Sequence, residues 1–258
     1  MNHIKIAFFD IDGTLIDMDK KVISNTMLET LVQLKKNGIV ICIATGRPPK
    51  TVPHFPEVEF DAYLTFNASY CYTKDQIIFK NPIPSSDVQK IIENGKKINR
   101  PVVIANAARM GANGRDQDLV DYFAIANQPV EIAEDFDDLA KEDIYQMMMG
   151  CYKEEYDQAL NRVEGAKITA WWSRAVDIIP VNGGKGLGVE KVLDFFNFTK
   201  EESIAFGDGT NDIEMLQAVG IGVAMGNATD DVKAIAGEVC GCVAGEGIYH
   251  YCKENHLI

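Results

Sequence analysis

The chain has 258 residues, enough for one large domain or two smaller ones, and 47% of them are apolar. Acidic residues outnumber basic residues 38 to 25, which gives a formal charge of −13. That charge opposes binding to nucleic acid or to an anionic membrane, and no apolar stretch approaches the ~20 residues of a membrane span. An anionic substrate would need local help from a metal ion, a lysine or a helix N-terminus.

The six cysteines indicate a reduced, cytoplasmic protein. None belongs to a C-x-x-C motif, and no histidine pair completes a zinc-binding spacing. The first apolar run is too short for a signal peptide and ends in acidic residues. The sequence leaves the oligomeric state open.

Asp10 directly follows the first predicted strand, Ile4–Phe9, and Asp12 lies two residues further on. Because side chains alternate along a strand, both carboxylates are expected to point to one side, and Gly13 then permits a tight turn. Like charges ~4 Å apart repel by roughly 1 kcal/mol in water and by ~4 kcal/mol at an effective dielectric of 20. The pair therefore indicates either a bound cation or a proton held by one acid.

The rest of the first segment alternates between helix and strand. A helix is predicted over about Ser24–Asn37 and a buried strand over Ile39–Ala44, which ends in Thr45-Gly46-Arg47. Another short strand, Tyr63–Phe66, ends at Asn67. The pattern is typical of a parallel sheet covered by helices on both faces.

From Pro82 the pattern changes to an α+β segment with antiparallel strands. Helices are expected over Asp87–Lys97, Asp118–Ala126 and Glu154–Val163. Strands are expected over Pro101–Ala105, Ile144–Cys151, Lys167–Trp172 and Ala175–Ile179.

The first pattern returns near Lys185. A helix over Gly186–Phe196 precedes a strand over Ser203–Phe206, which ends in Gly207-Asp208-Gly209-Thr210-Asn211-Asp212. The remaining expected elements are a helix over Ile213–Val219, a strand over Gly222–Ala224, a helix near Asp231–Ala236, a short strand around Val239–Val243 and a final helix. Residues 1–81 and 181–258 therefore predict one Rossmann-like α/β domain, interrupted by a second domain at 82–180.

Polar residues follow several of these strands at the point where each ends. In an open parallel sheet, ligands bind at the carboxyl ends of the strands. Carboxylate and amide oxygens there suit Mg²⁺ rather than a soft metal. Lys185 lies in a glycine-rich stretch that opens a helix, where it would add a positive charge for an anion, although the P-loop spacing is absent. The residues that would form this site are Asp10, Asp12, Thr45, Gly46, Asn67, Asp208, Asn211 and Asp212.

These stretches resemble the four ordered motifs of the haloacid dehalogenase superfamily. The motifs are Asp10-Ile11-Asp12-Gly13-Thr14, Ala44-Thr45-Gly46-Arg47, Lys185 and Gly207-Asp208-Gly209-Thr210-Asn211-Asp212. Their order, the large insert and the ending Gly245-Glu246-Gly247-Ile248 resemble the Cof-type branch with a type IIB cap, which is sugar-phosphatase-like. The resemblance implies an α/β core at 1–81 and 181–258 and an αββ-type cap at 82–180. Asn67-Ala68-Ser69 departs from the Asn-Gly-Ala common in the family, and Gly209 replaces a bulkier polar residue.

The resemblance implies Mg²⁺-dependent hydrolysis of a small phosphate monoester, with a sugar phosphate as the expected substrate. Asp10 would be the nucleophile and would form an aspartyl-phosphate. Asp12 would be the general acid and then the general base, which requires its protonation at the first step. Mg²⁺ would be held by the carboxylates of Asp10 and Asp208 and by the backbone carbonyl of Asp12.

The remaining motif residues are expected to bind the phosphate, and the cap is expected to act as a lid. Asp212 would orient Lys185 or a metal-bound water. Arg109 and Arg115 of the insert are candidates for setting specificity. The expected phosphate-binding residues are Thr45, Gly46, Arg47, Lys185 and Asn211.

Several other interpretations stay open at this point. Thr45 would suit a helix N-cap, and Arg47 would suit a surface turn before two prolines. A phosphomutase of the same fold and a non-catalytic sensor of phosphate ligands are the alternative functions.

Overall fold

The structure is a computed structural model that describes residues 3–170 and 172–258. It divides into two compact units. Unit 1 comprises residues 1–47, 52–80 and 184–258, and unit 2 comprises residues 48–51 and 81–183. The assignment of catalytic core and cap to these parts of the chain stays a prediction.

Unit 1 contains an eight-stranded sheet with the order β13-β12-β11-β1-β2-β3-β4-β5. Neighbouring strands from β13 to β3 are parallel, whereas β4 and β5 pair antiparallel as a hairpin at the edge. The expected Rossmann-like core is thereby confirmed, with an antiparallel extension that the sequence did not predict. The strands are β1 (Ile6–Phe9), β2 (Val40–Ala44), β3 (Ala62–Thr65), β4 (Tyr70–Tyr72), β5 (Ile77–Lys80), β11 (Ser203–Gly207), β12 (Ile221–Ala224) and β13 (Glu238–Val239).

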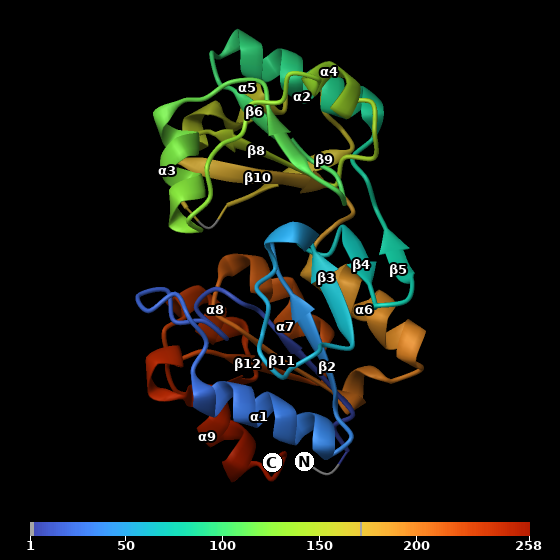
Figure 1. Cartoon of the computed structure of the whole chain (residues 1–258), viewed down its shortest axis with the longest axis vertical. Helices are drawn as coiled ribbons and strands as arrows, with labels where there is room; N and C mark the ends of the chain where they lie inside the picture. The colour runs from blue at the N-terminus through green and yellow to red at the C-terminus, as the bar shows by residue number, and fades with distance from the viewer. Residues whose placement is uncertain (1–2, 171) are drawn as a thin grey trace. The chain divides into compact units, whose positions relative to one another are not determined.

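Helices cover both faces of this sheet, as Figure 1 shows. The helices α1 (Asn25–Lys36) and α9 (Gly247–Glu254) pack on one face, where Phe9 and Phe206 stack with ring centroids 5.3 Å apart. Phe8 points to the opposite face, because strand side chains alternate. That face is covered by α6 (Lys185–Phe196), α7 (Ile213–Ala218) and α8 (Asp230–Ile235). Short 3₁₀ turns, η1 (Pro49–Thr51), η3 (Lys200–Glu202), η4 (Thr210–Asp212) and η5 (Val243–Gly245), lie in the connections.

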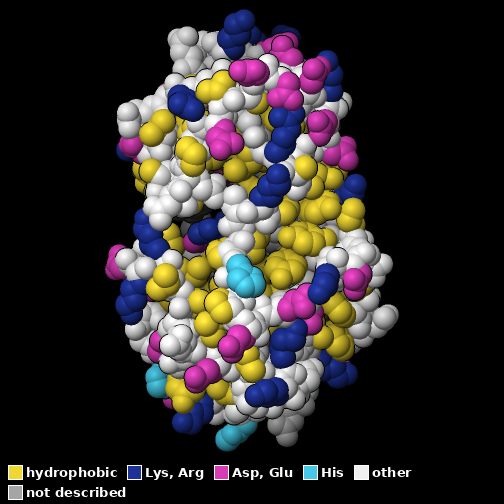
Figure 2. Space-filling view, in the orientation of Figure 1, with side chains coloured by type: hydrophobic (Ala, Val, Ile, Leu, Met, Phe, Trp, Pro, Cys, Tyr) yellow, Lys and Arg dark blue, Asp and Glu magenta, His cyan; other side chains and the backbone are white. Residues whose placement is uncertain are grey.

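The β4–β5 hairpin carries apolar and aromatic side chains to the surface. Tyr72 lies against both Tyr63 and Tyr70, with ring centroids 5.2 and 5.4 Å apart, and Ile77 is exposed. Figure 2 shows hydrophobic side chains gathered over β3, β4 and β5 on this face of unit 1. The hairpin therefore ends the sheet with an apolar surface.

Unit 2 is built on a five-stranded antiparallel sheet with the order β7-β6-β8-β10-β9. Its largest apolar cluster lies between the sheet and the helices α2, α4 and α5, and includes Met147 and Met149. All three consecutive methionines, Met147 to Met149, are buried in the central strand β8. The elements are α2 (Ser85–Lys97), β6 (Val102–Ala105), β7 (Met110–Ala112), α3 (Gln117–Ile125), α4 (Phe136–Leu139), β8 (Gln146–Gly150), η2 (Lys153–Glu155), α5 (Tyr156–Ala159), β9 (Ala166–Thr169) and β10 (Ala175–Pro180).

Unit 2 also contains a group of ion pairs, here called the arginine cluster: Arg100, Arg174, Asp116, Asp118 and Glu155. Arg100 binds Glu155 through two hydrogen bonds of 3.1 and 2.8 Å and reaches Asp118 at 2.8 Å. Arg174 donates to the second oxygen of Asp118 at 2.9 Å through Nε. Burial would raise the pKa of Asp118, but Arg174 and Arg100 outweigh it and hold that pKa below its ordinary value.

One expected helix and one expected strand are shorter in the structure. The helix expected over Glu154–Val163 is reduced to η2 and the single turn α5, and Arg162 beyond it adopts a left-handed φ of 60° that a helix cannot continue through. Trp171, in the strand expected over Lys167–Trp172, lies outside the described residues.

The strand expected around Val239–Val243 ends at Val239. The carbonyl of Cys242 accepts hydrogen bonds from the N–H groups of Gly245 and Gly247, which turns the chain into η5 instead. Within the described part of the chain, all six cysteines are free thiols, and no helix is long and apolar enough to cross a membrane.

Candidate active site

A buried lysine joins two carboxylates at the carboxyl edge of the unit 1 sheet. Asp10 directly follows β1, Asp212 lies in η4 after β11, and Lys185 is the first residue of α6. The Nζ of Lys185 donates to Oδ1 of Asp10 at 2.6 Å and to Oδ1 of Asp212 at 2.5 Å. The Lys185 side chain is 0% exposed, so these carboxylates are the groups that neutralise its charge.

Asp208 stands beside this group at the end of β11. Its Oδ1 accepts a hydrogen bond of 2.8 Å from the Thr14 hydroxyl. Gly13 has a φ of +86°, and a Cβ at this position would lie 2.2 Å from Oδ2 of Asp208, so only glycine permits this approach. The loops after β1 and β11 therefore meet closely.

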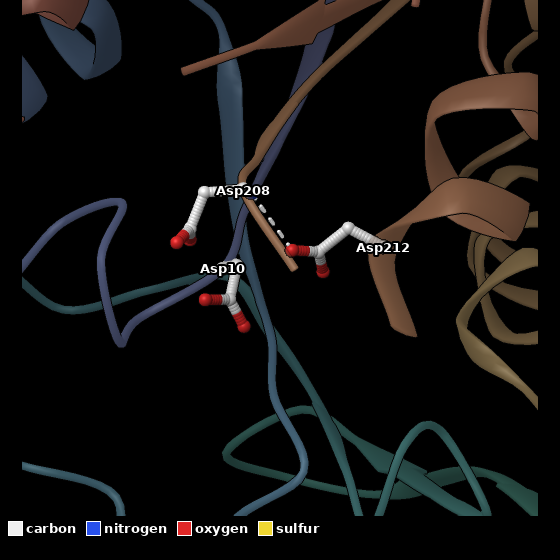
Figure 3. A group of neighbouring side chains, drawn as sticks. All are labelled: Asp10, Asp208 and Asp212. Carbon is white, nitrogen blue, oxygen red and sulfur yellow. Dashed lines mark hydrogen bonds between the residues drawn. The ribbon is translucent and has the colours of Figure 1, made fainter. Parts of the chain in front are cut away.

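Figure 3 shows the carboxylates of Asp10, Asp208 and Asp212 grouped together, with one oxygen atom from each lying within 4.8 Å of the others. The dashed line marks the 2.9 Å hydrogen bond from the backbone N–H of Asp208 to Oδ2 of Asp212, and the N–H of Gly209 donates to the same oxygen at 2.9 Å. Both oxygens of Asp212 are therefore engaged by the protein itself.

The electrostatics of this group favour an added positive charge. Burial raises the pKa of Asp10 well above its ordinary value, and the charge of Lys185 opposes that shift without cancelling it. Burial and the charge of Asp212 raise the pKa of Asp208 to about 6. Burial alone would lower the pKa of Lys185, but Asp10 and Asp212 raise it above its ordinary value, so the lysine stays charged.

The donor set fits Mg²⁺, which prefers hard oxygen ligands. Among the described residues, Oδ2 of Asp10 has no hydrogen-bond partner, and Asp208 brings a second carboxylate oxygen to within 4.8 Å of one oxygen of Asp10. Asp212 is a weaker candidate for a metal ligand, since Lys185 and two backbone N–H groups already bind its oxygens. The ligand set expected from the sequence, which uses Asp10, Asp208 and the carbonyl of Asp12, is compatible with this arrangement and stays a prediction.

Arg47 lies against Asp12. Its Nε donates to Oδ2 of Asp12 at 2.8 Å and its Nη2 donates to Oδ1 at 2.6 Å, so both carboxylate oxygens are held. The hydrogen bonds that Arg47 donates to Asp12 raise the pKa of Arg47, its partial burial opposes that shift, and the pKa is raised on balance. The role of Arg47 in phosphate binding stays a prediction, and this contact adds a second possible role, the orientation of Asp12.

Thr45, Gly46, Asn67 and Asn211 come together at the same edge of the sheet. The N–H of Asn67 donates to the carbonyl of Thr45 at 2.9 Å, and the amide of Asn211 donates to Oδ1 of Asn67 at 3.0 Å. A Cβ at Gly46 would lie 3.2 Å from the Asn67 amide. Asn67 keeps a left-handed φ of 51° without the glycine that commonly follows in the family.

Two polar contacts of the site were not predicted as such. Thr14 belongs to the first motif but has no expected role of its own, and Asn227, which follows β12, lies outside the four motifs. The Asn227 amide donates to the carbonyl of Gly13 at 2.8 Å. Asn227 could have been found by the rule used for the other residues, because it is a polar residue just past the end of a parallel strand.

The two arginines expected to set specificity belong to unit 2. Arg109 binds Asp135 through two hydrogen bonds, at 2.9 and 2.5 Å, and Arg115 is exposed. Their role in specificity stays a prediction.

Comparisons with known proteins agree on one family. The sequence profile of the haloacid dehalogenase-like hydrolases matches residues 7–252. The protein named "Putative phosphatase YkrA" from Bacillus subtilis is 33% identical over 98% of this chain and 98% of its own length. The 5-amino-6-(5-phospho-D-ribitylamino)uracil phosphatase YitU, also from Bacillus subtilis, is 28% identical over 95% of both chains.

A solved structure gives the same result. The haloacid dehalogenase subclass IIB sugar phosphatase BT4131 is 29% identical, with a TM-score of 0.91 over 98% of this chain and 100% of that one. The match of sequence profile, relatives and fold confirms the resemblance found in the motifs. This chain therefore belongs to the haloacid dehalogenase-like hydrolase family.

Proposed function

We propose that this protein is a Mg²⁺-dependent phosphatase that hydrolyses a small phosphate monoester, with sugar phosphates as its substrate class. The family and the similarity to phosphatases support the reaction. The sugar phosphatase BT4131 and YitU, whose name gives a phosphorylated ribityl group, support the substrate class.

One observation carries the proposal: a fully buried lysine bridges Asp10 and Asp212, with a third carboxylate beside them. A structural role would be better served by neutral, well-packed side chains, because burying several charges costs several kcal/mol per ion. The raised pKa of Asp208 indicates that this cost is not fully offset within the protein. Such a cluster favours a site that binds a cation and an anionic group together.

Asp10 is the proposed nucleophile. Its carboxylate attacks the phosphorus atom, and Lys185 holds that carboxylate in place through Oδ1. The new Asp10 O–P bond forms as the bond from phosphorus to the leaving alcohol oxygen breaks, and a water then cleaves the aspartyl-phosphate. Lys185, kept charged by its two carboxylates, lowers the repulsion between the nucleophile and the phosphate.

Asp12 is the proposed acid and base. It donates a proton to the leaving alcohol and later accepts one from the attacking water. Arg47 holds both of its oxygens, so the pair must loosen at one oxygen when Asp12 carries the proton. Arg47 would orient the carboxylate between these steps.

Mg²⁺, when bound by Asp10, Asp208 and the Asp12 carbonyl, would supply charge neutralisation for the approach of a carboxylate to a phosphate. The protein's own donors complete the phosphate site. We assign this role to the Thr45 hydroxyl, the backbone at Gly46, the Asn211 amide and Lys185, which all lie at the carboxyl edge of the unit 1 sheet. Asp212 fixes the position of Lys185.

The test is phosphate release from a panel of sugar and polyol phosphates with MgCl₂, for the wild type and Asp10→Asn. We expect hydrolysis by the wild type, without any bisphosphate activator, and a loss of at least about 10³-fold in the variant. Equal rates in the two proteins would contradict the mechanism. Transfer of the phosphoryl group to a second sugar hydroxyl, with little free phosphate, would favour a phosphomutase instead.

A further inference from the structure

Asn227 connects three loops at the carboxyl edge of the unit 1 sheet. It follows β12, whereas its partners follow β1, follow β11 and begin η5. Its Nδ2 donates to the carbonyl of Gly13 at 2.8 Å and lies 3.4 Å from Oδ2 of Asp208. Its Oδ1 accepts from the N–H of Val243 at 2.9 Å.

The orientation of the Asn227 amide is determined by these partners. A backbone N–H can only donate, so the atom that faces Val243 must be the oxygen. The amide nitrogen must then face the Gly13 carbonyl and the Asp208 carboxylate, both of which are acceptors. Neither contact survives if the amide is reversed.

The partners of Asn227 are parts of the proposed cation site. Gly13 directly follows Asp12, whose carbonyl is a proposed ligand, and Asp208 is a proposed carboxylate ligand. Thr14 holds Oδ1 of Asp208 at 2.8 Å, and Asn227 lies against Oδ2. The two side chains therefore hold the carboxylate from both sides, while Asn227 also anchors the turn that carries the Asp12 carbonyl.

We propose that Asn227 is a positioning residue that sets the geometry of the cation site by holding the Gly13 carbonyl and the Asp208 carboxylate together. This inference rests on the Mg²⁺ site of the proposed function. Partners of metal ligands typically change metal affinity by 10- to 100-fold when removed. Asn227 is exposed, so water replaces part of its contribution, and we expect an effect of about 3- to 10-fold.

The test measures Mg²⁺ binding without substrate. Thermal unfolding midpoints of the metal-stripped full chain are recorded against MgCl₂ at constant ionic strength, and the rise in midpoint gives an apparent Kd. The variants are Asn227→Ala, Asn227→Ser, Thr14→Val and the double variant with Thr14→Val and Asn227→Ala. The matched control is Asn37→Ala, because Asn37 also links distant segments of unit 1, donating to the carbonyl of Leu257 at 2.8 Å, but contacts no site carboxylate.

We expect the apparent Kd for Mg²⁺ to rise about 3- to 10-fold in Asn227→Ala, less in Asn227→Ser, and not in Asn37→Ala. Thr14→Val should also weaken binding, and its effect should not add to that of Asn227→Ala, because both side chains hold Asp208. An unchanged Kd in Asn227→Ala would overturn the inference, and if that variant does not fold, an unchanged Kd in Asn227→Ser would do so. A wild type that does not respond to Mg²⁺ would instead refute the cation site of the proposed function, and the inference with it.

Discussion

Two clusters of charged residues, the lysine-bridged carboxylates of unit 1 and the arginine cluster of unit 2, show pKa shifts in opposite directions. In unit 1, burial raises the pKa values of Asp10 and Asp208. In unit 2, Arg174 and Arg100 outweigh burial and lower the pKa of Asp118, and Arg100 together with the N–H of Tyr152 does the same for Glu155. The arginine cluster is satisfied by its own partners, which is typical of a structural role.

The carboxylates of unit 1 are not satisfied to the same degree. Lys185 is a single cation shared between Asp10 and Asp212, and within the described residues the carboxylate of Asp208 accepts hydrogen bonds only from neutral donors, Thr14 and Asn227. The site thus retains an unbalanced negative charge that a cation can neutralise. We infer that the carboxylates around Lys185 lower the stability of unit 1 because they form a functional site, whereas the arginine cluster contributes to the stability of unit 2.

The largest effect is expected from removing the bridging lysine. Lys185→Met leaves two buried carboxylates without their cation, so the free energy of unfolding should fall by about 3–5 kcal/mol, and kcat/KM by at least about 10²–10³-fold. Urea unfolding and phosphate release measure the two effects. Lys191→Met in the same helix is the control, since Lys191 lies over the Phe79 ring away from the carboxylates. A similar small change in both variants would refute the bridging role.

The next effect is a dependence of stability on pH. The pKa of Asp208 is raised from 3.8 to about 6 on folding, so its contribution to stability is present at low pH and is lost as the pH rises through about 6. For the metal-free protein this loss is on the order of 2–3 kcal/mol. Urea unfolding in EDTA between pH 4 and 8 measures it.

In Asp208→Asn this part of the fall should be absent, so the decline with rising pH should be smaller, and the part that comes from the raised pKa of Asp10 should remain. The arginine cluster should act in the other direction, because the lowered pKa of Asp118 gives stability that is lost only as the pH falls below the ordinary range of a carboxyl group. Parallel pH profiles for the wild type and Asp208→Asn would argue against the raised pKa.

The same chemical change should have opposite effects on stability in the two groups. Asp118→Asn removes the charge that binds two arginines and should cost about 1–3 kcal/mol. Asp10→Asn removes a buried charge whose pKa is already raised, so the metal-free protein should lose no stability or gain up to about 1 kcal/mol, although activity is lost. Chemical unfolding of the two variants decides this. Equal losses of stability would mean that the charges of the site are neutralised within the protein as fully as those of the arginine cluster.

The smallest effect concerns the two possible roles of Arg47. If it orients Asp12, Arg47→Ala should lower kcat/KM about tenfold more for alkyl phosphates than for p-nitrophenyl phosphate, whose leaving group needs no proton. If it binds phosphate instead, all substrates should be affected alike. Steady-state kinetics over a series of leaving groups separates the roles, and a uniform loss would contradict the orientation of Asp12.

Much of the fold was predictable because its central strands are continuous apolar runs. The runs that form β1, β2 and β11 are fully buried or nearly so, and each ends in a polar motif. The β4–β5 hairpin was not predicted, since its strands are only three and four residues long and are partly exposed. Helix α5 is shorter than expected because Arg162 is left-handed, which nothing in the sequence around it signals.

The site was predictable in its members but not in all its contacts. The position of polar residues after parallel strands placed Asp10, Asp208 and Thr45 at one edge of the sheet. The spacing of residues cannot tell which side chain a long arginine reaches, so the contact of Arg47 with Asp12 came only from the structure. Asn227 obeys the same rule, because it lies just past the end of β12, but it belongs to none of the four motifs and was therefore missed.

The most direct test of the proposed mechanism traps the phosphoryl group on Asp10. In Asp12→Asn, p-nitrophenyl phosphate can still phosphorylate Asp10, because nitrophenolate leaves without a proton, but no base activates water for the second step. With Mg²⁺ we expect a rapid release of nearly one equivalent of nitrophenolate, slow turnover afterwards, and a phosphoryl group on Asp10 by mass spectrometry of the acid-quenched protein. Slow release without such a burst from a folded variant, together with an unmodified Asp10, would contradict the aspartyl-phosphate mechanism.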